Sequence, residues 1–187
     1  MKLKIIKFKS VKSTNDVAIK LIQKHKHPSG LIISDTQLKG RGTMGKKWIS
    51  NKGNIFISIF FKVDFTKVKI KFFLNINAKI IKKILKSYTK KIIMIKKPND
   101  LIIEKKKFCG ILQEVIEHND NKFLITGIGI NTSTSPYNKN FSSTCLNNHT
   151  KKIIKNSEII KNIKKSYEKM INDLNNNNFS YIKNKYI

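Results

Sequence analysis

Apolar positions alternate with polar ones in several short segments, and this pattern predicts β-strands. The first segment, residues 3–9, alternates like a strand apart from the pair Ile5-Ile6, whereas residues 55–62 form an almost continuous run of Ile and Phe. A run of this kind indicates a strand that is buried on both faces. The predicted strands lie at about 3–9, 31–35, 55–62, 101–103, 107–117 and 122–130, with a further short apolar segment at 92–95.

Helical spacing of apolar residues appears in four other segments. Ser13-Thr14-Asn15-Asp16 precedes apolar positions 17, 18, 21 and 22, as expected where polar residues cap a helix that ends before Pro28. Residues 67–88 are predicted to form a long amphipathic helix with a lysine-rich face, and residues 156–174 are also predicted to be helical. Asn175 to Asn178 read as a short linker before a last helix at 181–187.

Turn signals between the strands indicate hairpins. Lys97-Pro98-Asn99-Asp100 and Glu104-Lys105-Lys106 each separate two apolar segments, and Thr132 to about Ser143 is a polar loop. The chain has 187 residues and no internal repeat, which suits a single domain over 1–187. We therefore expect an α+β fold, with a largely antiparallel sheet and helices on one face.

Positive charge dominates the composition. The formal net charge is +28, which suggests nucleic-acid binding. The lysines are spread along the whole chain, however, and accompany an excess of Ile and Asn. These three residues share A/T-rich codons, so we attribute the charge to nucleotide bias and expect no specific nucleic-acid partner. Weak, salt-sensitive binding is still expected.

Cysteine usage and hydropathy bear on the compartment. Cys109 and Cys145 are the only cysteines and lack metal-site spacing, which suits a reducing cytoplasm. No stretch approaches the ~20 apolar residues of a membrane span, and residues 1–7 lack the apolar core of a signal peptide.

The loop Gly40 to Trp48 holds the chain's only arginine, Arg41, between glycines. Arginine offers a planar fork that can grip a carboxylate or phosphate at two points. The loop superficially fits G-x-G-x-x-G and Walker A patterns, but both require a following helix. A turn and the predicted strand 55–62 follow instead, so we reject both.

Four separated segments together resemble the catalytic domain of bacterial biotin–protein ligases. They are Ser13-Thr14-Asn15, Gln37 to Trp48, Lys96 to Asp100, and Lys107 to Leu112. Two weaker segments, Gly127 to Asn131 and Ser143 to Leu146, follow in the family's order. The tail from Tyr181 is similar to the helix that closes the family's central domain.

The resemblance implies a class II synthetase-like fold with a mixed sheet, and a two-step reaction. Biotin's carboxylate attacks the α-phosphate of ATP to give biotinyl-5′-AMP and pyrophosphate. A lysine of the expected partner, the biotin carboxyl carrier protein of acetyl-CoA carboxylase, then takes the biotinyl group. ATP and biotin would be substrates, with Mg²⁺ as cofactor.

The family's motifs imply roles for particular residues. Arg41 would hold the biotin carboxylate and the α-phosphate, and Lys107 would place a point charge on the same oxygens. Asp100 is the candidate Mg²⁺ ligand, because carboxylates suit that hard cation. The remaining substrate-binding candidates are Ser13, Thr14, Asn15, Gln37, Gly40, Gly42, Thr43, Trp48, Asn99, Gly110, Gly129 and Asn131.

The chain departs from the family pattern at several points. Thr43 stands where a second arginine is usual, and Lys97 where tryptophan is usual. The first motif begins at Ser13, so we expect no N-terminal DNA-binding domain. The sequence ends at Ile187, where many members begin a C-terminal SH3-like barrel, so we expect that barrel to be absent.

Three alternatives stay open. Lipoate–protein ligase shares the fold and the adenylate chemistry, although the Gly-Arg-Gly loop and the Lys-Pro-Asn-Asp segment favour biotin. A basic nucleic-acid-binding protein without enzymatic activity is the second alternative. A ligase that folds but no longer turns over is the third.

Overall fold

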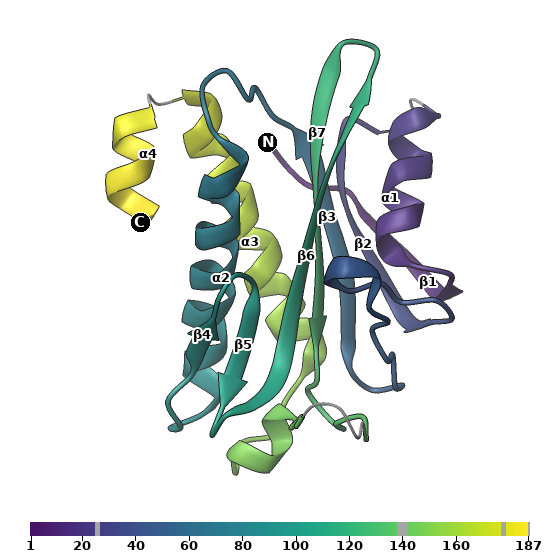
Figure 1. Ribbon diagram of the computed structural model, residues 1–187, viewed down its shortest axis with the longest axis vertical. Coiled ribbons are helices and arrows are strands. Elements are labelled where there is room, and N and C mark those ends of the chain that lie inside the picture. Colours follow the sequence, from purple (N-terminus) through teal and green to yellow (C-terminus); the bar gives the residue numbers. More distant parts are fainter. Residues whose placement is uncertain (25–26, 138–141, 177–178, 187) are drawn as a thin grey trace.

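The computed structural model describes residues 1–24, 27–137, 142–176 and 179–186. Within them, seven strands form one sheet in the order β1-β2-β3-β7-β6-β5-β4 (Figure 1). The strands are β1 (Ile5–Val11), β2 (Ser29–Gln37), β3 (Ile55–Lys62), β4 (Met94–Lys96), β5 (Asp100–Ile103), β6 (Lys106–His118) and β7 (Asn121–Ile130).

Strand pairing makes the sheet mixed and largely antiparallel. β1 pairs with β2 in parallel, and every other neighbouring pair is antiparallel. The turn between β5 and β6 carries positive φ at Glu104 and Lys105, as a tight hairpin requires. The predicted α+β class and the predicted strands are confirmed, with the short apolar segment at 92–95 becoming β4 at 94–96.

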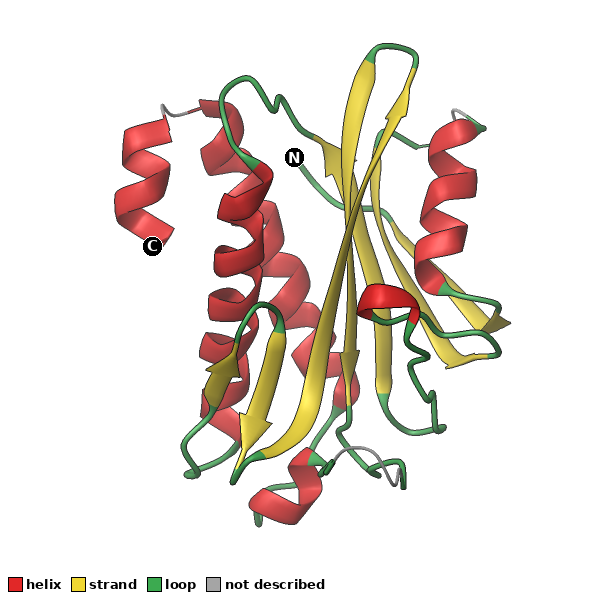
Figure 2. Cartoon of the chain, viewed as in Figure 1, coloured by secondary structure: helices red, strands yellow, loops and turns green. Residues whose placement is uncertain are grey.

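Helices lie on both faces of the sheet (Figure 2). The α-helices are α1 (Thr14–Gln23), α2 (Ile70–Leu85), α3 (Asn156–Asn176) and α4 (Phe179–Tyr186). Three short 3-10 segments are η1 (Thr43–Gly45), η2 (Lys86–Tyr88) and η3 (Leu146–His149). The predicted linker therefore begins inside α3, and its last two residues, 177 and 178, lie outside the described residues.

The expectation of helices on one face was wrong for α1. In β3, Ile57 and Ile59 point into the large core that α2 and α3 cover. Phe60, on the opposite face, packs with Ala18 and Ile22 of α1. A strand covered on both sides needs apolar residues at every position, which explains the unbroken Ile/Phe run. None of the described helices is long and apolar enough to cross a membrane.

The central hairpin of β6 and β7 sets the register that matters for the site. Gly110 lies opposite Gly129, and Leu112 lies opposite Gly127. Three glycines on two neighbouring strands leave the α1 face of the sheet bare of side chains there. The α1 N-terminus and the loop of residues 40–48, called the glycine loop below, both border this bare patch (Figure 1).

Candidate active site

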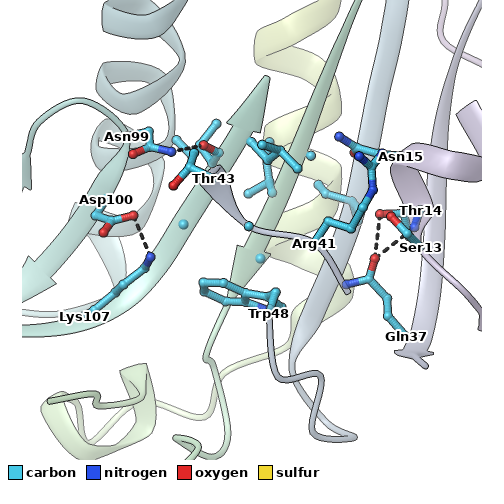
Figure 3. Close-up of a pocket in the computed structure, with 18 residues that line it drawn as sticks. Ser13, Thr14, Asn15, Gln37, Arg41, Thr43, Trp48, Asn99, Asp100 and Lys107 are labelled. Atoms are coloured by element: carbon cyan, nitrogen blue, oxygen red, sulfur yellow. Dashed lines mark hydrogen bonds and ion pairs between the residues drawn. The ribbon is translucent and has the colours of Figure 1, made fainter. Parts of the chain in front are cut away.

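A cavity opens on the α1 face, where the α1 N-terminus, the end of β2, the glycine loop, β6 and β7 meet (Figure 3). Of the predicted site residues, it gathers all but Gly40 and Asn131. Its described lining is Ser13, Thr14, Asn15, Gln37, Arg41, Gly42, Thr43, Trp48, Ile57, Asn99, Asp100, Lys107, Gly110, Ile111, Leu112, Gly127, Ile128 and Gly129.

A buried polar network forms one end of the cavity. The Gln37 side-chain oxygen accepts hydrogen bonds from the Thr14 backbone N–H at 2.9 Å and from the Thr14 hydroxyl at 3.1 Å. The Ser58 hydroxyl contacts the Thr14 hydroxyl at 2.7 Å and donates to the Asn15 side-chain oxygen. Such a network offers fixed donors and acceptors to a small polar group. Ser13 occupies the N-cap position of α1, but its side chain makes no capping hydrogen bond.

Gly127 makes room for this network. A Cβ atom at position 127 would lie 2.4 Å from the Asn15 side-chain oxygen, far inside contact distance. Only glycine therefore allows Asn15 to lie flat against β7. The position of Asn15 depends as much on this glycine as on its own helix.

Arg41 is held by two carboxylates. Its terminal nitrogens donate to both oxygens of Glu114, each at 2.8 Å, and one of them lies 2.8 Å from an Asp16 oxygen. Burial alone would lower the pKa of Arg41, but the hydrogen bonds and charges of Glu114 and Asp16 outweigh it and raise the pKa. The arginine is thus a permanent cation with its fork already engaged.

Lys107 lies at the other end of the cavity, and fewer charged groups hold its side chain than hold that of Arg41. Its ammonium is 2.7 Å from an Asp100 oxygen and 5.2 Å from the centre of the Trp48 ring. A cation over an indole face is attracted by the ring quadrupole. Asp100 and Trp48 therefore hold Lys107 from two sides, as Figure 3 shows.

Trp48 lies directly on the glycines of β6 and β7. Cβ atoms at Gly110 and Gly129 would come within 2.6 Å and 2.4 Å of the indole ring. The indole N–H is buried and has no hydrogen-bond partner among the described residues. The glycine patch of the sheet therefore accommodates a flat ring, here the Trp48 indole, directly against the backbone.

Three predicted residues have contacts that bear on their roles. Asn99 is buried and donates to the Ile111 carbonyl at 2.6 Å, which ties the turn before β5 to β6. Gly40 is buried, and a Cβ there would lie 2.5 Å from the Trp48 carbonyl, so its position is set by packing within the loop. Asn131 is buried, and its side-chain oxygen has no hydrogen-bond partner in the part of the chain that the structure describes.

A second, adjoining cavity is rich in lysine. It shares Lys107, Asp100, Trp48 and Thr43 with the first cavity and also contains Asn131. Its other lysines are Lys46, Lys47, Lys96 and Lys105. Several cations around a single carboxylate favour a polyanion such as a polyphosphate.

Asp100 is the predicted metal ligand, and it lines the cavity. Among the described residues, no three His, Cys, Asp or Glu side chains converge as a metal site would require. One carboxylate does not retain Mg²⁺ alone, but this ion is commonly held by one or two carboxylates together with substrate phosphates. The donor set therefore suits Mg²⁺ that arrives with a phosphate ligand.

Comparison with known proteins accounts for this arrangement. The model of the biotin/lipoate A/B protein ligase family matches residues 7–131, which is more than half of the chain. The chain belongs to this family. Arg41, Lys107 and the glycines of β6 and β7 all fall inside the matched segment.

Individual relatives extend the match beyond the family segment. The bifunctional ligase/repressor BirA of Bacillus spizizenii is 28% identical over 179 residues, which cover 92% of this chain and 55% of that protein. The chain thus spans about half the length of this curated relative.

Two solved structures share the fold. Biotin protein ligase from Aquifex aeolicus, in complex with biotin and ATP, aligns with a TM-score of 0.77 at 25% identity, over 98% of this chain and 76% of the other. Biotin protein ligase from Leishmania major, in complex with biotinyl-5-AMP, aligns with a TM-score of 0.74 at 20% identity, over 99% and 79%. The predicted family and fold are confirmed.

Sequence reasoning missed Glu114, Asp16, Ser58 and Gly127. Glu114 follows Gly110 and Leu112 at a spacing of two, so it shares their face of β6. It is also an acid within a strand of a chain with only 11 acidic residues. Ser58 interrupts an otherwise apolar strand. Both were detectable as polar exceptions to an apolar pattern.

Proposed function

We propose that the chain catalyses ATP-dependent attachment of biotin to a lysine of a biotin carboxyl carrier protein. The observation that carries the proposal is the pairing of Arg41 and Lys107 in one cavity, one at each end of a bare glycine patch. A reaction between two anions needs fixed cations that offset their repulsion. The complexes of the relatives with biotin, ATP and biotinyl-5-AMP support the same substrates.

The polar network would take the non-reacting end of biotin. Thr14, Asn15 and Gln37 present both donors and acceptors, as a ureido ring with N–H and C=O groups demands. This end would position the biotin carboxylate toward Arg41. The glycine loop, which carries Arg41, would exclude water from the reacting oxygens.

The first step would join the two substrates. A biotin carboxylate oxygen attacks the α-phosphorus of ATP, the new C(O)–O–P bond forms, and the bond to the β-phosphate oxygen breaks as pyrophosphate leaves. Lys107 would stabilise the charge that develops on the α-phosphate, and the adjoining lysines would hold the departing phosphates. Mg²⁺ arriving with ATP would neutralise phosphate charge, with Asp100 as its protein ligand.

In the second step, the amine of a carrier lysine attacks the acyl carbon of biotinyl-5′-AMP. The amide bond forms, AMP leaves with the electron pair of the C–O bond, and the amine loses a proton. Cys109 offers no competing nucleophile, because burial raises the pKa of its thiol. Both cysteines are unpaired and buried, in keeping with our proposal that the protein acts in the cytoplasm.

Product analysis tests this function against lipoate ligation. The purified chain is incubated with Mg²⁺, ATP and either biotin or lipoate, and adenylates are identified by mass spectrometry. Biotinyl-5′-AMP with biotin, and at most traces of lipoyl-5′-AMP with lipoate, is the expected result. The reverse preference would make it a lipoate ligase, and binding of both substrates without any adenylate would indicate a decayed enzyme.

A further inference from the structure

The acidic residues around Arg41 stand out in a chain of net charge +28. Two of its 11 acidic residues, Asp16 and Glu114, contact its only arginine. They come from different elements, the first turn of α1 and the middle of β6. Neither belongs to the described lining of the cavity, although Arg41 does.

The geometry leaves Arg41 little free hydrogen-bonding capacity. Glu114 accepts one hydrogen bond from each terminal nitrogen, and an Asp16 oxygen forms an ion pair at 2.8 Å with one of the same two nitrogens. A guanidinium has five N–H donors in a fixed fork. Glu114 occupies the edge formed by the two terminal nitrogens, and Asp16 lies against one of these nitrogens. A ligand carboxylate can therefore form a two-point contact with the terminal nitrogens of Arg41 only after a protein carboxylate has moved away from them.

The same contacts anchor the glycine loop. The backbones of Arg41 and Lys47 form an isolated antiparallel β-bridge within the loop, and the Gly42 N–H donates to the Lys46 carbonyl at 2.7 Å. Holding the Arg41 side chain against α1 and β6 therefore holds the whole small loop, including Trp48, against the sheet. Within the cluster of Arg41, Asp16 and Glu114, two negative charges more than balance the positive charge of the guanidinium.

We propose that Asp16 and Glu114 are positioning residues that act on Arg41 as a carboxylate latch. In the free protein they keep the loop in place, and the ligand's carboxylate binds by exchanging with an acid on the guanidinium. The latch makes the cavity select for ligands whose own carboxylate can replace one from the protein. This inference rests on the proposed function only for the identity of that ligand.

Asp16→Asn is the cleaner test, because the Asp16 side chain is paired with Arg41, whereas Glu114 also accepts a hydrogen bond from Asn15 at 2.7 Å. Glu114→Gln is the second variant, since a Gln nitrogen must face a donor of either Arg41 or Asn15. Glu117→Gln serves as the matched control. Glu117 lies on the same strand but is paired with Lys122, at 3.8 Å.

Two measurements decide the question. Hydrogen exchange of the amides of residues 40–48 in the free protein should quicken about fivefold in both variants and not in Glu117→Gln, the range expected for a partly exposed ion pair. Calorimetry with biotin and with its uncharged methyl ester should show that Asp16→Asn raises the ratio of biotin to ester affinity about fivefold. A structural role alone would change both affinities together.

Unchanged loop exchange in both latch variants would overturn the proposal, and so would an unchanged affinity ratio. If the wild type bound neither ligand, the proposed function would fail instead. The exchange comparison would then still decide whether the latch exists, because it needs no ligand.

Discussion

The two cations of the cavity are held in different ways. Arg41 makes three short contacts with two carboxylates from α1 and β6, whereas Lys107 makes one contact with Asp100 and rests against Trp48. The Arg41 end has a local excess of negative charge. The Lys107 end opens onto Lys46, Lys47, Lys96 and Lys105.

This difference matches two kinds of anion. A planar guanidinium recognises a carboxylate through direction, so it needs supports that fix its plane. An ammonium acts as a point charge and needs mainly nearness, which a cluster of lysines can provide for a polyphosphate. The cavity therefore divides into an end where geometry selects and an end where charge density attracts.

The largest effect on the reaction rate is expected at the lysine-rich end of the cavity, where Lys107 lies. Lys107→Ala removes a cation that favours the transition state over the ground state, so pyrophosphate release with biotin and ATP should fall by ~10²–10³. Lys106→Ala is the matched control, because Lys106 is the exposed neighbour on the same strand. A folded Lys107→Ala protein with the wild-type rate would remove Lys107 from the chemistry.

Arg41→Lys tests the geometric end. The charge stays, but the fork and its two-point contact are lost. Biotin affinity or the adenylation rate should drop at least ~10-fold, equivalent to about 1.4 kcal/mol. Steady-state kinetics measure both, with exposed Lys39→Ala as the control in the same segment. Kinetics equal to wild type would mean that Arg41 acts only as a point charge, and the two ends would not differ.

Gly129→Ala tests the packing of the Trp48 indole against the glycine patch that lies between Arg41 and Lys107. The added methyl group would come within 2.4 Å of the Trp48 ring, so the indole must leave the sheet. Because Trp48 is the only tryptophan, its fluorescence should shift to the red. We propose that Trp48 packs over the adenine of ATP, so ATP affinity should fall roughly 10-fold, as loss of a stacked ring predicts. Lys122→Ala, at an exposed position of the same strand, is the control. Unshifted emission would show that the glycine patch tolerates a side chain.

Thr43→Arg tests whether an added cation between the Arg41 end and the Lys107 end of the cavity improves retention of biotinyl-5′-AMP. Thr43 lines both cavities, and the family's usual arginine there would add a cation over the intermediate. Wild type should release some biotinyl-5′-AMP and label an unrelated lysine-rich protein on a streptavidin blot. The variant should lower that signal about threefold, a gain within the range of one partly exposed charge. If wild type labels only its carrier and Thr43→Arg changes nothing, retention does not depend on this position.

Much of the fold was predictable from local patterns. β3 was predicted at its observed bounds, because a continuous Ile/Phe run suits only a doubly covered strand. The Glu104-Lys105 turn and the start of α1 were predicted from turn and capping residues. The side of the sheet that α1 covers was not predictable, since an amphipathic helix fits either apolar face of a strand like β3.

The sequence by itself determined the family, the strands and most of the residues that line the cavity, because motifs and apolar periodicity are written locally in the chain. Only the tertiary structure decided what those residues touch. Arg41 and Glu114 lie 73 positions apart, and Trp48 reaches glycines of β6 and β7. Such contacts arise from strand register and loop placement, which depend on the packing of the whole sheet.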